Sequence, residues 1–349
     1  MSSGNHNKSK AYLFVSILLT IALFCSHSSF AVDQDVQDRF AVAPSPEEIA
    51  KQEDYVSEIT DRLDISAYVD IQMGYDNNVD LNSKRHKDGF QQLTGNVEAT
   101  YSLLDNLDLK AGTDIFETIY FKYNRNNIMD VSPYAGFNLL ITPDFIWRNR
   151  IKFDSFNYVN EKESTFQGLV LTTYLRNYFL EEVYQEVGFE YLKRWYPDRK
   201  TFNSDARRCD KDRIDDRFRI KYTVGAYFER AFLRVSNQIS SNDSNDNFQQ
   251  YYDYWLYRLR PSIMVFFTDN FYTDVSLVYR YWRYKDRRST EDPGRRERDH
   301  TYIFNASFYY DITENITLGA TYSYSENVSN DPYEDYSGSI ISGGVYYSF

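Results

Sequence analysis

Hydrophobic and polar residues alternate along residues 337–349, at the end of the chain. Ile341, Val345, Tyr347 and Phe349 share one parity, while serine, glycine and tyrosine fill most of the other. A period of two residues is typical of a β-strand with two different faces. Because chain ends usually fray, a strand that runs to a terminal aromatic residue requires a pairing partner.

The same alternation recurs in segment after segment from residue 65 onward. In the first of them, Ile65, Val69 and Ile71 lie on one side, whereas Asp70 lies on the other. We count about fourteen strands of this kind by their period of two. The rest of the chain is therefore a run of strands that resemble the last one.

Tight turns and longer polar loops alternate between these strands. Tight turns are expected at 105–106, 142–144 and 313–315, and long loops at 77–89, 197–213 and 285–299. A closed barrel with an even number of strands produces this alternation, whereas a soluble sandwich does not. The sequence predicts an all-β fold: a closed antiparallel transmembrane β-barrel of about 14 strands over residues 64–349.

The N-terminus has the pattern of a secretory signal peptide over residues 1–31. Lys8 and Lys10 precede an apolar run at 11–24, and small residues flank a cleavage position after Ala31. The alternative is a transmembrane anchor, but the run is shorter than the roughly 20 residues that a spanning helix needs.

Residues 32–63 form a polar, acidic leader before the first strand. Ser45, Pro46 and Glu47 match the start of a short helix, with a capping serine, proline at the first position and acidic charge at the positive end. We expect a short periplasmic helix on a tether. The alternatives are a plug in the barrel lumen and a docking helix for a periplasmic partner.

Aromatic residues are unusually abundant, with 33 Tyr and 25 Phe. Tyrosine suits a membrane–water interface because its ring is apolar and its hydroxyl is polar. The mean hydropathy of −0.61 would by itself indicate a soluble protein. In a transmembrane barrel, however, every second residue faces a polar lumen, which lowers the mean.

Charge and cysteine content argue against a nucleic-acid-binding protein and against a disulfide-stabilised one. The formal net charge is −12, and removal of Lys8 and Lys10 with the signal peptide makes it −14, so nucleic acid is not an expected partner. Cleavage also removes Cys25 and leaves Cys209, so an intramolecular disulfide is not possible.

Residues suited to catalysis or metal binding are sparse. After cleavage the histidines are His86, in the first loop, and His300, at the base of the sixth, and neither has a recognisable nucleophilic serine nearby. The oxygen-rich segments 76–80 and 242–246 lack the spacing of an EF-hand loop. We therefore expect no enzyme activity, no catalytic residue, no metal site and no cofactor.

Basic residues concentrate on the inward parity of the later strands, and acidic residues on that of the early strands. The acidic set includes Asp70, Glu98, Asp108, Asp114 and Asp130. The candidate lumen or solute-contact residues are Arg148, Arg150, Arg217, Arg219, Lys221, Arg234, Arg258, Arg260, Arg280 and Trp282. One interpretation is a lumen narrowed by cross-barrel ion pairs. The other is a solute path, because arginine binds carboxylates and phosphates, and a mixed-charge, aromatic lining suits saccharides.

Short motifs support a family resemblance. Gly74-Tyr75-Asp76-Asn77-Asn78-Val79 closes the first strand, Tyr346-Tyr347-Ser348-Phe349 ends the last, and Tyr-x-Tyr strands recur between them. Together they resemble the outer-membrane β-barrel porin family, of the type associated with exopolysaccharide production. The resemblance implies the outer membrane of a Gram-negative bacterium, contact with its lipid and lipopolysaccharide, and recognition of the terminal Phe349 strand by the barrel-assembly machinery.

Three functions fit these observations. The first is a porin-like channel that passes a polar solute, saccharide or anionic, in connection with polysaccharide export. The second is a closed structural or adhesive outer-membrane protein whose loops bind a partner. The third is an outer-membrane hydrolase.

Overall fold

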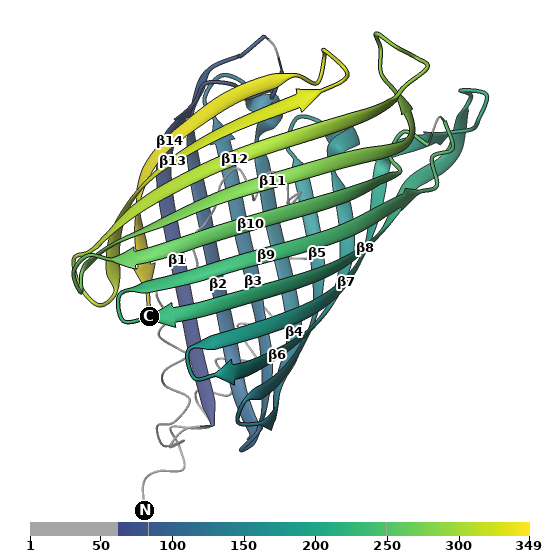
Figure 1. Ribbon diagram of the computed structural model, residues 1–349. Helices are drawn as coiled ribbons and strands as arrows, with labels where there is room; N and C mark the ends of the chain where they lie inside the picture. Colours follow the sequence, from purple (N-terminus) through teal and green to yellow (C-terminus); the bar gives the residue numbers. More distant parts are fainter. Residues whose placement is uncertain (1–61, 83, 249) are drawn as a thin grey trace, which may run out of the picture.

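Fourteen strands form one closed antiparallel barrel in the computed structural model (Figure 1). The structure describes residues 62–349 except 83 and 249. The expected signal peptide at 1–31 and the helix expected near Ser45 lie outside the described residues. No helix in the described part of the chain is long and apolar enough to cross a membrane.

The strands follow one another around the barrel in sequence order. They are β1 (Leu63–Asp76), β2 (Asp88–Leu104), β3 (Leu107–Tyr120), β4 (Ile128–Thr142), β5 (Phe145–Tyr158), β6 (Phe166–Leu180), β7 (Val183–Phe202), β8 (Arg208–Phe228), β9 (Ala231–Ser244), β10 (Tyr254–Phe266), β11 (Phe271–Arg288), β12 (Arg296–Asp311), β13 (Ile316–Ser329) and β14 (Tyr336–Ser348). Two short 3-10 turns, η2 (Asn124–Asn126) and η3 (Lys162–Ser164), lie in loops.

The terminal strand closes the barrel by pairing with the first one. Val69 is opposite Tyr347 in the β1–β14 ladder. At the chain end, the Ala67 and Phe349 backbones exchange two N–H···O hydrogen bonds, each 3.0 Å long. The expectation that the aromatic C-terminus has a pairing partner is confirmed, and closure leaves no open sheet edge in lipid.

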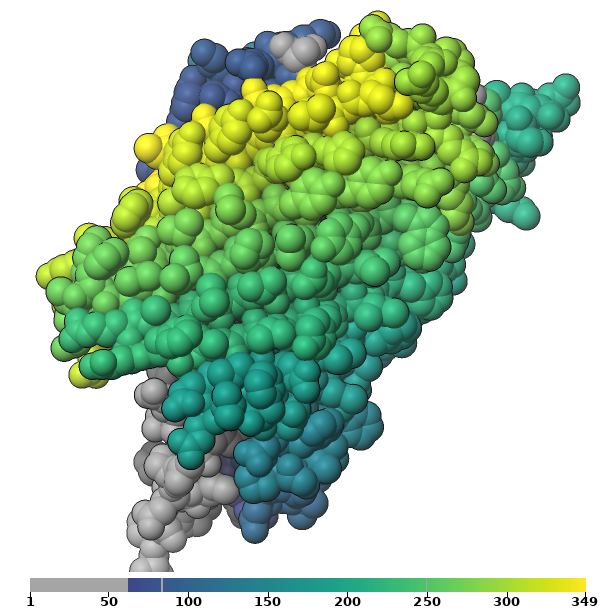
Figure 2. Space-filling model, in the orientation of Figure 1, coloured from purple at the N-terminus to yellow at the C-terminus, as the bar shows by residue number. Residues whose placement is uncertain are grey.

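The two faces of the wall differ as the alternation predicts. In β1, Ile71 is 50% exposed and Met73 63%, while the alternate residues Asp70 and Gln72 are 0% and 8% exposed. The exposed apolar parity faces lipid and the buried polar parity faces the interior, because charge at the lipid-facing midplane is costly. Figure 2 shows the lipid-facing wall of the later strands as a continuous, steeply inclined surface.

Two of the expected long loops are shorter than predicted. The 197–213 segment is mostly strand, since β7 runs to Phe202 and β8 begins at Arg208, and the 285–299 loop narrows to 289–295. The ladder continues because backbone hydrogen bonds do not require apolar side chains where both faces are wet. In Figure 1 the β7–β8 hairpin, in teal, projects beyond the neighbouring strands.

Candidate functional site

All ten predicted lumen residues lie on the inward-facing parity of their strands. Arg217, Arg219, Arg258 and Arg280 are 5–8% exposed, whereas the side chain of Arg150 is 41% exposed. Their lipid-facing neighbours include Phe218, Ile220, Trp255 and Leu277.

The ladder registers join four of these cations into one row across the inner wall. From β5 to β11 the row runs Arg148, Tyr174, Gly188, Lys221, Gln238, Arg258 and Arg280. Arg258 and Arg280 are directly opposite each other on β10 and β11. Lys221 lies over the Tyr174 ring, 5.5 Å from its centroid. We call Arg148, Lys221, Arg258 and Arg280 the cation row.

Gly188 makes room for this arrangement. A Cβ at this position would lie 2.3 Å from the Tyr174 ring. The missing side chain therefore lets the ring lie flat over β7, beneath the Lys221 ammonium.

Acidic residues on β7 pair with two cations that flank the row on either side. Arg219 pairs with Glu190 at 2.8 Å, and Arg176 pairs with Glu186 at 2.9 Å. Each pair joins residues that are directly opposite on neighbouring strands. Arg176 was not among the sequence candidates, because it lies close to a periplasmic turn and its register with Glu186 is not visible in the sequence.

The opposite wall, from β1 to β4, is predominantly acidic. On it Lys110 pairs with Glu98 at 2.5 Å. Arg150 of β5 reaches Asp114 of β3 at 2.8 Å, and its guanidinium lies over the Tyr134 ring of the intervening strand β4, 3.5 Å from the centroid. These ion pairs join adjacent strands or next-but-one strands. The separation into a basic and an acidic wall is thus present in three dimensions.

Aromatic residues line the interior near the periplasmic turns. We call this group the tyrosine cluster: Tyr184, Phe232, Met264, Tyr272 and Tyr309, with Tyr178, Tyr227, Phe266 and Tyr346 packed against them. Arg176 lies 4.2 Å above the Tyr184 ring. The cluster was not predicted, because its members come from eight strands and are brought together only by register. The sequence signal was the inward parity of these residues.

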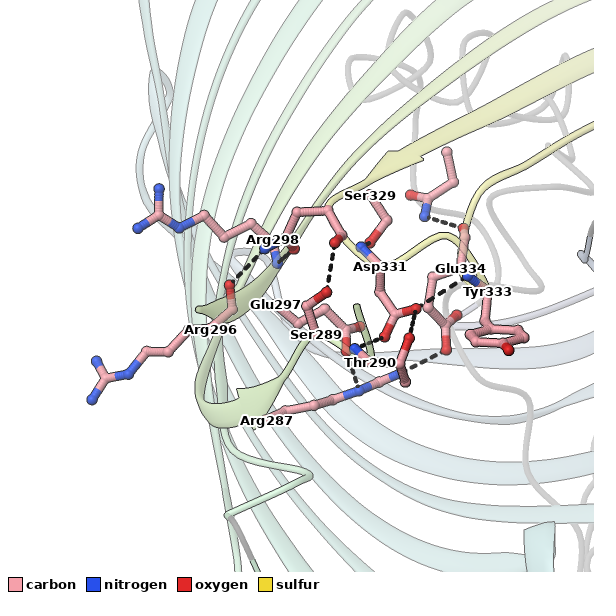
Figure 3. Close-up of polar contacts among 12 residues, drawn as sticks. Arg287, Ser289, Thr290, Arg296, Glu297, Arg298, Ser329, Asp331, Tyr333 and Glu334 are labelled. Atoms are coloured by element: carbon pink, nitrogen blue, oxygen red, sulfur yellow. Dashed lines mark hydrogen bonds and ion pairs between the residues drawn. The ribbon is translucent and has the colours of Figure 1, made fainter. Parts of the chain in front are cut away.

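The extracellular mouth is held by a network centred on Arg287 (Figure 3). Arg287 pairs with Glu297 at 2.7 Å and with Glu334 at 2.6 Å. Thr290 donates its backbone N–H and its hydroxyl to Asp331, at 2.8 and 2.7 Å. This network, which we call the rim clamp, ties the β11–β12 hairpin to the β13–β14 loop.

The two histidines occupy different settings. The Nδ1 atom of His86 forms a short hydrogen bond with Asp80, and the imidazole stacks on Tyr123, with ring centroids 4.8 Å apart. Burial raises the pKa of Asp80, but hydrogen bonds from His86 and Asn126 and nearby positive charge lower it below its ordinary value. His300 was expected at the base of a loop; it lies within β12, because that strand extends to Arg296.

The oxygen-rich segments mainly cap their own loops. Asp76 accepts hydrogen bonds from the Asn78 backbone at 2.8 Å and the Tyr120 hydroxyl at 3.1 Å. Asp246 accepts the Phe248 N–H at 3.1 Å. Within residues 62–349, apart from 83 and 249, no group of three or more His, Cys, Asp and Glu residues is placed to hold a metal ion.

The closed barrel and its lipid-facing belt define an outer-membrane β-barrel protein of a Gram-negative bacterium. No family model and no curated protein matches the sequence. Among solved structures, it is similar to a loop L8 deletion mutant of OmpT, an outer membrane protein of Vibrio cholerae. The TM-score is 0.50 at 11% identity, with 83% of this chain and 100% of that chain covered.

Two further structures are similar at lower scores. The anion-selective porin from Comamonas acidovorans has a TM-score of 0.47 and 9% identity, covering 82% of this chain and 99% of that one. A bacterial polysaccharide outer membrane secretin has a TM-score of 0.44 and 11% identity, covering 81% and 97%. At identities this low, similarity to these solved structures concerns the shared fold and says nothing about function.

Proposed function

We propose that this barrel is a channel that passes a polar solute, saccharide or anionic, in connection with polysaccharide export. The observation that carries the proposal is the cation row, in which Arg148, Lys221, Arg258 and Arg280 lie along one continuous ladder row of the inner wall. Arginine forks bind carboxylate or phosphate in bidentate geometry. An acidic saccharide carries such groups.

The tyrosine cluster supports the saccharide part of this proposal. Tyr272 and Tyr309 are buried and stack with ring centroids 5.1 Å apart. The rings that a solute can contact are therefore the partly buried ones at the margin of the cluster, Tyr178, Tyr227 and Tyr346. An aromatic ring offers an apolar face, and the tyrosine hydroxyl offers a hydrogen bond. A sugar ring presents apolar C–H faces and polar hydroxyls, so it fits such a lining better than a simple salt ion does.

The proposal assigns no reaction and no cofactor to the chain. Hydrolysis remains the competing function, to be tested at His86 and at the acidic residues near His300. Substitution of His86 by Gln and of Asp299 by Asn should leave any residual hydrolytic activity of the preparation unchanged. Loss of a measurable hydrolytic activity in either variant would favour an enzyme.

Single-channel conductance in a planar bilayer tests the channel. The refolded chain from residue 32 should give a stable current that an acidic oligosaccharide blocks in steps, and a neutral one of equal length should block it less. The variant R258Q/R280Q should lose the preference for the acidic sugar. The loop variant R295Q is the matched control, because Arg295 is 79% exposed and pairs with Asp292 outside the lumen.

A second experiment deletes residues 32–61 and repeats the conductance measurement, to test whether the leader plugs the lumen. The deletion stops before β1, because Leu63 pairs with Tyr101 and the Arg62 carbonyl accepts the Ser102 N–H. No current from either folded form would refute the channel. The closed adhesive alternative would then be tested on the rim loops.

A further inference from the structure

Four arginines form two like-charged pairs on the outer face of the β11–β12 hairpin. Arg283 is directly opposite Arg298, and Arg288 is directly opposite Arg296. Like charges directly opposite each other on a ladder destabilise it. In Figure 3 the side chains of Arg296 and Arg298 point away from the barrel, while Arg287 and Glu297 lie on its inner side. We call Arg283, Arg288, Arg296 and Arg298 the arginine ladder.

The protein itself supplies little negative charge to this group. Asp286 lies 3.0 Å from Arg296 and 3.9 Å from Arg288. Among the described residues, Arg283 and Arg298 have no carboxylate partner. These two arginines, directly opposite each other on the ladder, therefore lack a carboxylate that would offset their repulsion.

The ladder begins where the lipid-facing aromatic belt ends. Tyr281 and His300 are directly opposite each other on the same outward parity, with ring centroids 4.9 Å apart. Arg283 and Arg298 each lie two residues further toward the loops, a rise of about 7 Å along a strand. Because aromatic belts mark the level of the membrane interface, the ladder lies at the level of the outer-leaflet headgroups.

A hollow lies beside the ladder. Its volume is about 380 Å³, and its lining includes Trp255, Arg283, Lys285, Asp286 and Arg296. Lys285 is paired with Asp243 and Asp253, so Arg283 and Arg296 are the cations that the hollow offers to a ligand. Trp255 is 53% exposed and is opposite Arg283 in the β10–β11 ladder. The hollow thus combines cationic groups with an aromatic surface at the lipid interface.

We propose that the arginine ladder binds the phosphate groups of a phosphorylated lipid in the outer leaflet. Two arginines can each donate paired N–H groups to phosphate oxygens, and a multivalent anion between them removes their repulsion. Trp255 and the belt below would contact the acyl chains. The inference concerns the lipid-facing surface and does not rest on the proposed channel.

Binding of lipid A to the detergent-solubilised barrel from residue 32 tests the site. The probes are bisphosphorylated lipid A, the same lipid without phosphates, and inorganic phosphate as a competitor. We expect the phosphorylated lipid to bind at least about tenfold more tightly than the phosphate-free lipid, since hydrogen bonds between charged groups are strong. The variant R283Q/R298Q should lose most of that difference, and R283K/R298K should keep part of it, because charge remains but the fork is lost.

The variant K211Q/R230Q is the matched control, since it removes two exposed cations from other parts of the surface. It should bind lipid A as the parent does. If R283Q/R298Q does not fold, R288Q/R296Q makes the same test at the second pair. Equal binding of phosphate-free lipid, or equal loss in the control variant, would overturn the proposal. Full competition by inorganic phosphate at the lipid concentration would show a free-anion site and would overturn the lipid assignment.

Discussion

Replacing Arg287 by Met should open the extracellular mouth locally while leaving the barrel folded. Arg287 is 13% exposed, and its partner Glu297 is 1% exposed. Arg287 also lies over the Tyr251 and Tyr284 rings, 4.3 and 4.7 Å from their centroids. Burial raises the pKa of Glu297 to about 8 even with Arg287 beside it. Above that pH, where the variants are compared, removing the cation leaves a buried carboxylate without its ion-pair partner, which is the costly way to break a buried pair.

The expected cost is about 2–3 kcal/mol, below the roughly 3–5 kcal/mol of fully buried pairs, because the hairpin projects into water. A loss of this size raises local opening about 30- to 150-fold. Amide hydrogen exchange over residues 289–295 and 330–335 measures it directly, since both segments are joined by the rim clamp. Exchange in the ladder between β1 and β14 should not change.

Two variants decide whether the ion pair is the cause. The double variant R287M/E297Q removes the stranded charge, so it should exchange more slowly than R287M, and the double-mutant cycle should show a non-additive term. R295M removes an exposed pair with Asp292 in the same hairpin and should cost at most about 0.5 kcal/mol. Equal exchange in R287M and R295M, or no recovery with E297Q, would refute the reasoning.

Three further predictions concern topology, packing and pH. Cys209 follows the loop at the tip of the β7–β8 hairpin, so a membrane-impermeant maleimide should label it on intact cells, and C209S should abolish the labelling. Gly225→Leu should lower the urea midpoint of unfolding more than Gly294→Leu, because a Cβ at 225 would lie 2.2 Å from the Tyr184 ring. Burial raises the pKa of Asp331, but hydrogen bonds from Thr290 outweigh it and hold the pKa below its ordinary value. Because folding lowers this pKa, the ionised carboxylate stabilises the folded loop at any pH above the pKa that Asp331 has in the unfolded chain, and the stabilisation is lost as the pH falls further. Protease cleavage of the β13–β14 loop should therefore increase as pH falls below about 4, and less so in D331N.

Strand order and parity could be predicted because they follow from local properties of the sequence. Closure joins the two strands furthest apart in the chain, and it was predicted from the even number of strands and the aromatic C-terminus. Alternation fixes which side of a strand is polar, as with Ile71 and Asp70, and antiparallel neighbours follow from short connections. Loop length could not be read in the same way. Charged residues such as Lys200 and Asp212 suggested a loop, yet they are ladder partners in a hairpin beyond the membrane.

The chemistry of the interior was only partly predictable. The inward position of Arg258 and Arg280 follows from parity, but their direct opposition depends on register, which the sequence does not show. The tyrosine cluster was missed for the same reason, since Tyr309 and Tyr346 contact each other from non-adjacent strands with centroids 5.5 Å apart. Parity predicts which face a residue occupies, and register determines its neighbours.

The start of β12 shows how one register serves two faces. Arg296 and Arg298 point outward, toward the proposed lipid site, while Glu297 between them points inward, to the rim clamp. A register slip of one residue would exchange these faces. The two arginines would then point inward, toward the rim clamp, and Arg287 would lose its buried carboxylate partner. The buried Arg287–Glu297 pair therefore favours the register that presents the arginine ladder to the outer leaflet.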